Sequence, residues 1–257
     1  MFPIAQLPDI VIFANGEPST DAHSLQLLNR AQTIICCDGA VQKLLNLGYE
    51  PNRIIGDCDS ITAELYERYK NILIRDESTE YNDLQKALRY VIAEGYKSVA
   101  ILSSFGYRED HAIANLSIAA LYSRQIEILM VTQHGIFIPI NSTRSFYTHR
   151  GQQISIFSFN PEIRFTFHGL RYPVKERKFR YLWEGSLNEA LRKESTIECD
   201  GGDAAIYFAH KKKWKKNVSL QNLSIGKLRT VALTNIILQL WEQTFLQMKR
   251  ETLFLKK

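Results

Sequence analysis

Residues 54–60 read Ile-Ile-Gly-Asp-Cys-Asp-Ser, an apolar pair followed at once by two aspartates spaced i, i+2. If a strand ends at Ile55, Asp57 and Asp59 stand at its carboxyl end, where one loop can direct both carboxylates at a single divalent cation. Such oxygen ligands suit Mg²⁺, which usually takes one or two carboxylates and completes its shell with water and substrate phosphates. An isolated Asp-x-Asp is also common as a solvated turn before a helix, so the neighbouring segments decide between these readings.

Three further polar clusters follow apolar runs in the same way: residues 38–40, 80–83 and 106–111. Short strand-like runs near 9–14, 33–37, 53–56, 71–75, 98–103 and 126–131 alternate with apolar residues at helical spacing, as in 84–92 and 113–122. This alternation predicts an α/β fold with a parallel sheet flanked by helices. Ligands of such sheets bind outside the carboxyl ends of the strands, where all four clusters fall.

The pattern changes after residue 133. Residues 153–159 and 163–167 alternate apolar with polar side chains, and Pro161, Gly169 and Pro173 punctuate them. We therefore predict three parts: an α/β domain over 1–133, a smaller antiparallel β domain over 134–209, and a basic helical extension over 210–257.

The charge of the chain is concentrated at one end. Residues 210–257 hold 11 of the 32 Lys and Arg residues but only 2 of the 27 Asp and Glu residues. The run Lys-Lys-Lys-Trp-Lys-Lys at 211–216 could contact nucleic acid or an anionic membrane surface. Such a run is more often a solvated face beside a helix that packs on its own protein, so we expect neither a nucleic-acid nor a membrane partner.

The cysteines and the N-terminus indicate a cytoplasmic protein. The four cysteines show no Cys-x-x-Cys spacing, and three of them sit in or beside apolar segments, which favours buried free thiols over disulfides or structural zinc. Residues 1–8 lack a basic region followed by a long apolar stretch, so we expect no secretory signal.

Magnesium and a polyphosphate account for the acidic loops together. We expect Asp57, Asp59, Glu80 and Asp83 to hold the metal, and Arg108 to take up negative charge that develops on phosphate. Simpler roles stay open for five of the residues in these loops and helix starts. Asp83 can stabilise the first turn of a helix, Lys86 can be its surface partner, His111 can be a helix-start residue, and Asn15 with Gly16 can form a tight turn. No P-loop or Rossmann glycine motif is present in the sequence.

The ordered series of motifs resembles the thiamin pyrophosphokinase family. The matching pieces lie between residues 35 and 200: Cys37-Asp38-Gly39-Ala40, Gly56-Asp57-Cys58-Asp59-Ser60, Asn82-Asp83-Leu84-Gln85-Lys86, Arg108-Glu109-Asp110-His111, Gly169-Leu170-Arg171-Tyr172-Pro173 and Leu187-Asn188-Glu189. The resemblance implies an α/β domain followed by a β-sandwich, usually in a homodimer that holds thiamin between subunits. It also implies transfer of the terminal pyrophosphate of ATP to the thiamin hydroxyl, giving thiamin diphosphate and AMP.

The resemblance assigns further residues to the two substrates. On the ATP side it places Asn15, Asp38, Gly39, Lys86, Arg108, Asp110 and His111, and near the thiamin ring it places Ser186 and Asn188. The chain departs from the family pattern at Ser78, Glu80, Tyr107 and Leu187. Two other functions stay open: a magnesium-dependent nucleotide pyrophosphohydrolase, and a non-catalytic nucleotide- or thiamin-sensing module whose basic tail contacts nucleic acid.

Overall fold

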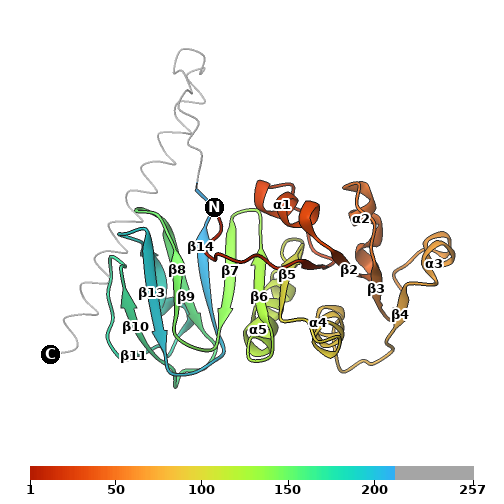
Figure 1. Cartoon of the computed structure of the whole chain (residues 1–257). Helices are drawn as coiled ribbons and strands as arrows, with labels where there is room; N and C mark the ends of the chain where they lie inside the picture. The colour runs from red at the N-terminus through yellow and green to blue at the C-terminus, as the bar shows by residue number, and fades with distance from the viewer. Residues whose placement is uncertain (212–257) are drawn as a thin grey trace, which may run out of the picture. The chain divides into compact units, whose positions relative to one another are not determined.

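The computed structural model describes residues 1–211, which form one compact unit (Figure 1). The predicted basic helical extension, apart from His210 and Lys211, lies outside the described residues. Within residues 1–211, no helix is long and apolar enough to cross a membrane.

Six parallel strands occupy the positions that the apolar runs predict. They are β1 (Ile10–Phe13), β2 (Thr33–Cys37), β3 (Arg53–Gly56), β4 (Leu73–Arg75), β5 (Ser98–Leu102) and β6 (Glu127–Val131). The spatial order of these strands is β6-β5-β1-β2-β3-β4. The chain adds β2, β3 and β4 on one side of β1 and then β5 and β6 on the other side, so the loops after β1 and β5 lead away from each other. In open α/β sheets this switch point is the usual ligand site.

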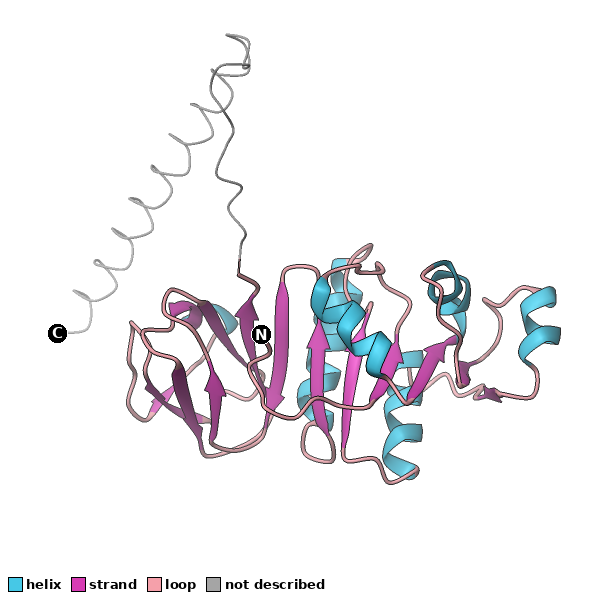
Figure 2. Ribbon diagram, turned by 45° about the horizontal axis from the view of Figure 1, so that its top comes forward, coloured by secondary structure: helices cyan, strands magenta, loops and turns pink. Residues whose placement is uncertain are grey.

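Helices cover both faces of the parallel strands (Figures 1 and 2). The helices α1 (Ala22–Arg30) and α2 (Val41–Asn46) lie on one face, and α4 (Asp83–Ala93) and α5 (Glu109–Tyr122) lie on the other. The short helices η1 (Asp38–Ala40) and α3 (Ala63–Tyr69) complete this half. Of the α4 residues at helical spacing, Leu84, Ala87, Leu88 and Val91 are buried and Ile92 is partly buried. Ile113 of α5 is 63% exposed, so it lies on the solvent side of its helix.

Four of the antiparallel strands extend the parallel sheet, and the other four form a separate sheet. The chain turns back over residues 132–134, a connection too short for a parallel crossover, so β7 (Gly135–Ile140) pairs antiparallel with β6. Then β14 (Ala204–Ala209), β9 (Gln153–Ser158) and β12 (Gly185–Glu189) continue the same sheet to ten strands. The boundary at 133 stays a prediction, but the sheet runs through it.

A second sheet of four strands packs on the antiparallel end of the first. Its order is β11 (Arg177–Lys178), β10 (Arg164–His168), β13 (Glu194–Cys199) and β8 (Arg144–Tyr147). The rings of Phe146 and Phe208 meet between the two sheets, with their centres 5.0 Å apart. The short helix η2 (Leu182–Glu184) precedes β12. The mixed α/β fold with a separate antiparallel sheet is therefore confirmed.

Candidate active site

Three carboxylates gather at the carboxyl ends of β2 and β3. Oxygens of Asp38, Asp57 and Asp59 all lie within 4.8 Å of one another. Asp38 is buried, Asp57 is partly exposed and Asp59 is exposed, so the cluster opens to solvent on one side. This donor set fits Mg²⁺, because it offers hard oxygen ligands and leaves an open side for water and phosphate.

Backbone donors hold Asp38 in this position. Its carboxylate accepts hydrogen bonds from the N–H groups of Gly39 and Cys58, at 2.6 and 2.7 Å. Gly56, the last residue of β3, makes the approach possible, since a Cβ there would lie 2.3 Å from the Asp38 Cγ. Burial and the neighbouring carboxylates, Asp83 first, raise the pKa of Asp38 despite these bonds. Asp38 is thus a partly dehydrated carboxylate that a cation would stabilise.

The start of α4 brings Asp83 beside this cluster. Asn82 caps the helix and exchanges hydrogen bonds with Gln85, which fixes Asp83 in the first turn. Burial raises the pKa of Asp83 above its ordinary value, although the ammonium of Lys86 acts in the opposite direction. The Lys86 side chain is only 3% exposed and its Nζ lies 3.6 Å from the Asp83 carboxylate. Lys86 is therefore a buried cation, not the surface partner that the sequence also allowed.

Glu80 lies apart from the three-carboxylate cluster. It is exposed, and its backbone N–H donates to the hydroxyl of Ser78 at 3.3 Å. The structure thus brings Asp38 to Asp57 and Asp59, where the sequence had placed Glu80. The role of Glu80 as a metal ligand stays a prediction.

A cavity of about 280 Å³ opens at the switch point beside the acidic residues. Residues after β1, after β5 and at the start of α4 line it, among them Asn15, Gly16, Asp83, Arg108 and His111. Gly16 has to be a glycine because a Cβ would lie 2.4 Å from the carbonyl oxygens of residues 103 and 105. The cavity is large enough for part of a nucleotide and has acidic and basic walls.

Arg108 and Asp110 form an exposed ion pair at the mouth of this cavity. The Arg108 Nε lies 3.1 Å from the Asp110 carboxylate, and this bond lowers the pKa of Asp110 to about 2. The pair is at the surface, so phosphate can compete for the guanidinium at modest cost. Tyr107, before Arg108, has a φ of 62°, a left-handed conformation that favours glycine.

Lys43 is a cation of this site that sequence reasoning missed. Its Nζ donates to the backbone oxygen and the side-chain Oδ1 of Asn15, at 2.7 and 2.6 Å, and lies 4.8 Å from the centre of the Tyr107 ring. Burial lowers its pKa. Lys43 follows Asp38-Gly39-Ala40 on α2, but nothing in the local pattern indicates that it turns back towards the loop after β1.

Comparison with known proteins agrees with this geometry. The sequence model of the thiamin pyrophosphokinase catalytic domain matches residues 24–130, and that of the thiamin pyrophosphokinase substrate-binding domain matches residues 135–207. The chain belongs to the thiamin pyrophosphokinase family. The catalytic-domain match contains the acidic cluster and every residue of the cavity except Ala14, Asn15 and Gly16.

Relatives and solved structures of the thiamin pyrophosphokinase family cover most of the described chain. Thiamine pyrophosphokinase 3 of Oryza sativa subsp. japonica is 25% identical over an alignment of 213 residues, which covers 71% of this chain and 80% of that protein. Thiamine pyrophosphokinase 1 of the same plant is 25% identical over an alignment of 186 residues, which covers 60% of this chain and 70% of that protein. The fold is similar to thiamine pyrophosphokinase from Bacillus subtilis, with a TM-score of 0.64 and 18% identity, covering 79% of this chain and 100% of that chain. The fold is also similar to thiamin pyrophosphokinase from Candida albicans, with a TM-score of 0.65 and 16% identity, covering 81% of this chain and 96% of that chain.

Ser186 and Asn188, the residues predicted near thiamin, lie in the region matched by the substrate-binding domain of the thiamin pyrophosphokinase family. Both are on β12, where the pairing with β9 is irregular between residues 185 and 188. The Ser186 hydroxyl donates to the carbonyl of Trp183 at 2.6 Å. Asn188 is buried. Its side-chain amide donates to the carbonyl of Tyr172 at 2.8 Å and accepts from the N–H of Tyr172 at 3.1 Å. Leu187 between them is 56% exposed and has a φ of 58°.

The structure does not bring β12 to the acidic cluster. In the ten-stranded sheet, β12 is one edge strand, and seven inter-strand steps separate it from β2. At about 4.8 Å a step, the distance is roughly 33 Å. The predicted thiamin contacts and the predicted metal ligands therefore lie far apart within one chain.

Proposed function

We propose that this chain is a thiamin diphosphokinase, which transfers the terminal pyrophosphate of ATP to the hydroxyl of thiamin and gives thiamin diphosphate and AMP. The observation that carries the proposal is the three-carboxylate cluster beside the cavity at the switch point, in a chain that matches both domains of the thiamin pyrophosphokinase family. Phosphoryl-type transfer needs chiefly positioning and charge neutralisation, and this arrangement of acidic and basic side chains offers both.

The acidic residues are proposed to hold the metal and the polyphosphate. Asp57 and Asp59 would be direct Mg²⁺ ligands, with Asp38 as a third carboxylate and Asp83 beside them. When bound there, Mg²⁺ would neutralise negative charge on the phosphate oxygens. Lys86, buried against Asp83, balances part of the negative charge that four carboxylates would otherwise concentrate at this edge.

The basic residues and the cavity are proposed to bind ATP. Arg108 would leave Asp110 and pair with phosphate, while His111 and Asn15 line the cavity beside it. Lys43 fixes the loop after β1 by holding Asn15. The hydroxyl oxygen of thiamin then forms a bond to the β-phosphorus and releases its proton to solvent, the bond from that phosphorus to the bridging oxygen of AMP breaks, and AMP leaves with the electron pair.

We further propose that the active form is a homodimer in which thiamin lies between subunits. The distance of roughly 33 Å between β12 and β2 supports this, because one chain cannot hold the two reacting groups in contact. Exposed apolar side chains near β12 support it too: Tyr181, Leu182, Trp183 and Leu187 are 62%, 44%, 59% and 56% exposed. An apolar patch of this kind typically marks an interaction surface.

A cytoplasmic location is proposed on the state of the cysteines. Cys36, Cys37, Cys58 and Cys199 are all free thiols, and three of them are buried, as the sequence predicted. Unpaired cysteines are typical of a reducing compartment.

The test is to incubate the purified chain with ATP, Mg²⁺ and thiamin and to measure AMP and thiamin diphosphate together. Equal amounts of both products, dependent on thiamin and abolished by EDTA, are the expected result. AMP without thiamin diphosphate would replace the proposal with nucleotide hydrolysis. If neither AMP nor thiamin diphosphate forms, the proposal is refuted in favour of a sensing module.

A further inference from the structure

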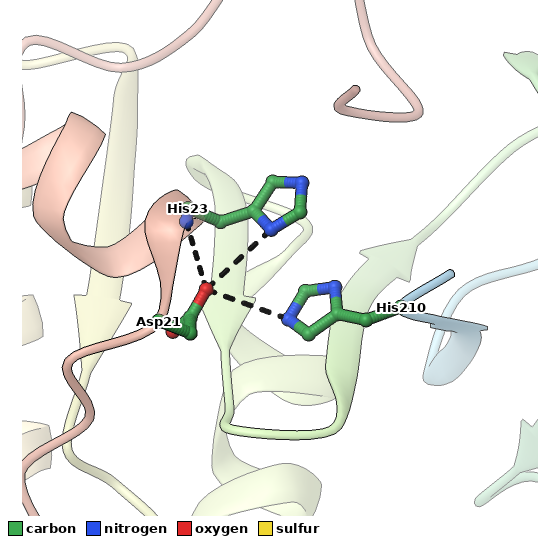
Figure 3. Close-up of side chains that lie close together, drawn as sticks. All are labelled: Asp21, His23 and His210. Carbon is green, nitrogen blue, oxygen red and sulfur yellow. Dashed lines mark hydrogen bonds and ion pairs between the residues drawn. The ribbon is translucent and has the colours of Figure 1, made fainter. Parts of the chain in front are cut away.

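Asp21, His23 and His210 form a second cluster of metal-ligating side chains, away from the acidic cluster (Figure 3). Asp21 and His23 come from the start of α1, and His210 directly follows β14. The figure shows the three side chains directed towards one another, although His23 and His210 are 187 positions apart in the sequence. Tertiary folding alone brings them together.

The spacing of the donor atoms suits one small ion. The Asp21 Oδ1 lies 3.4 Å from the His23 Nδ1 and 3.7 Å from the His210 Nε2. Ligands about 2.1 Å from a tetrahedral Zn²⁺ ion lie about 3.4 Å from one another. The two measured separations are close to this value, and all three donor atoms lie within 4.8 Å of one another.

The carboxylate is already held by a second layer of hydrogen bonds. The Asp21 Oδ2 accepts from the hydroxyls of Ser19 and Ser24, at 2.8 and 2.5 Å. Asp21 also caps α1: its Oδ1 accepts from the backbone N–H groups of His23 and Ser24, at 2.8 and 3.3 Å, and faces the two imidazoles. Outer partners of this kind orient a metal ligand and are part of most protein metal sites. The side chains of Asp21, His23 and His210 are 15%, 19% and 17% exposed, so an ion can reach them from solvent but is sheltered once bound.

Two features of the cluster define what binding has to change. The imidazoles of His23 and His210 stack 4.3 Å apart and nearly parallel, at 5°. Two stacked rings cannot both aim a ring nitrogen at one ion, so at least one ring has to rotate. His210 also has to exchange its 3.0 Å bond to the Thr132 carbonyl for the ion. Both rings are partly exposed, and both adjustments are rotations of side chains.

We propose that Asp21, His23 and His210 bind a divalent transition-metal ion of the Zn²⁺ class. Two imidazoles and one carboxylate favour such an ion over Mg²⁺, which prefers oxygen ligands. The ion links the start of α1 to the residue that follows β14. Ser19 and Thr132, which contact the cluster, also line a cavity of about 170 Å³. This cavity shares Ser104 and Gly106 with the cavity of the active site. The ion therefore stabilises the wall next to the nucleotide site and takes no part in transfer.

The test uses the full chain, stripped with a chelator and kept in excess Mg²⁺ so that oxygen-only sites are filled. Co²⁺ is titrated as a probe, because its visible absorption reports tetrahedral ligation, and Zn²⁺ binding is measured by calorimetry. The variants are His23→Gln and His210→Gln. His168→Gln is the matched control, since His168 also pairs with a carboxylate, that of Glu198 at 2.6 Å, but lacks a second imidazole. Circular dichroism confirms that each variant is folded.

The expected result is one equivalent of Co²⁺ or Zn²⁺ in the unmodified chain and in His168→Gln. Loss of a direct ligand in His23→Gln or His210→Gln should weaken binding by at least about 100-fold, the upper range for loss of an outer partner. Binding of Zn²⁺ should also raise the melting temperature of the unmodified chain. The proposal is overturned if the unmodified chain binds no equivalent, or if either cluster variant binds as well as the control. It is equally overturned if the absorption is that of a thiolate complex, which would place the ion at Cys58. None of these readouts depends on the transfer reaction.

Discussion

Two inactive variants of this chain should restore each other's activity if each active centre uses residues from two copies. Within one chain, Ser186 on β12 and Asp57 after β3 are separated by at least the seven inter-strand steps between β12 and β2. This corresponds to roughly 33 Å, whereas the thiamin hydroxyl and the phosphorus that it attacks have to be in contact. In a two-fold homodimer, Ser186 of one copy can complete the centre that contains Asp57 of the other.

The perturbation is a pair of substitutions, one on each half of the centre. Asp57→Asn removes a predicted metal ligand, and Ser186→Trp fills space beside the predicted thiamin contacts. Each homodimer carries the same defect in both centres and should be inactive. Random mixing of two variants gives half heterodimers, and each heterodimer has one intact centre of two, so the mixture should reach about one quarter of the unmodified activity.

The assay is thiamin diphosphate formation by chains co-expressed with different affinity tags, so that heterodimers can be isolated. Purified heterodimer should reach about half of the unmodified activity, since one of its two centres is intact. Co-expression of Asp57→Asn with Asp59→Asn is the control, because both defects lie in the same half and no intact centre can form. Isolated Asp57→Asn and Ser186→Trp heterodimer that is no more active than its parents would refute the shared active centre.

Three other outcomes follow from the site. Asp57→Asn should lower the transfer rate at least about 100-fold with an unchanged melting temperature. Glu80→Gln should lower the rate less than about tenfold, because Glu80 lies outside the carboxylate cluster. Equal losses of rate in the two variants, measured from AMP release, would restore Glu80 as a ligand. Gly56→Ala should displace Asp38 and abolish metal-dependent transfer. Gly201→Ala is the control and should be active, because a Cβ at Gly201 meets its nearest atom at an ordinary 3.6 Å. An active Gly56→Ala enzyme would contradict the role of the close approach between Gly56 and Asp38. Burial and neighbouring carboxylates raise the pKa of Asp38, so Asp38 binds a proton at a higher pH than an ordinary aspartate, and the Mg²⁺ concentration for half-maximal rate should rise as the pH falls. A flat dependence on pH would show that Asp38 stays ionised or takes no part.

The elements of the α/β half could be predicted from the sequence because their signals are local. Every parallel strand except the edge strand β4 is a short apolar run that the sheet buries on both faces, and all six were predicted to within two residues of their observed bounds. The start of α4 is also a local signal, since Asn82 and Gln85 form a capping box within four residues. For the same reason Asp83 was predicted at the start of a helix, next to the other acidic loops.

The composition of the site depended on contacts that no local pattern reports. Asp38 joins Asp57 and Asp59 because Gly56 leaves room for its carboxylate, and the sequence had assigned Asp38 to the nucleotide and Glu80 to the metal. Lys43 reaches Asn15 over 28 residues of sequence. Each of these contacts is a distance between loops of different strands, which spacing along one segment does not determine.

The sequence by itself determined which edge of the parallel sheet carries the chemistry, because strand polarity places every polar loop that follows a parallel strand at the same edge. Only the tertiary structure decided that the alternating strands extend that sheet to ten, with β12 at its far edge. It also decided that His210 returns to Asp21 and His23. The physical reason is that an alternating apolar pattern fixes which face of a strand is buried, whereas the neighbour of that strand follows from packing across the whole chain.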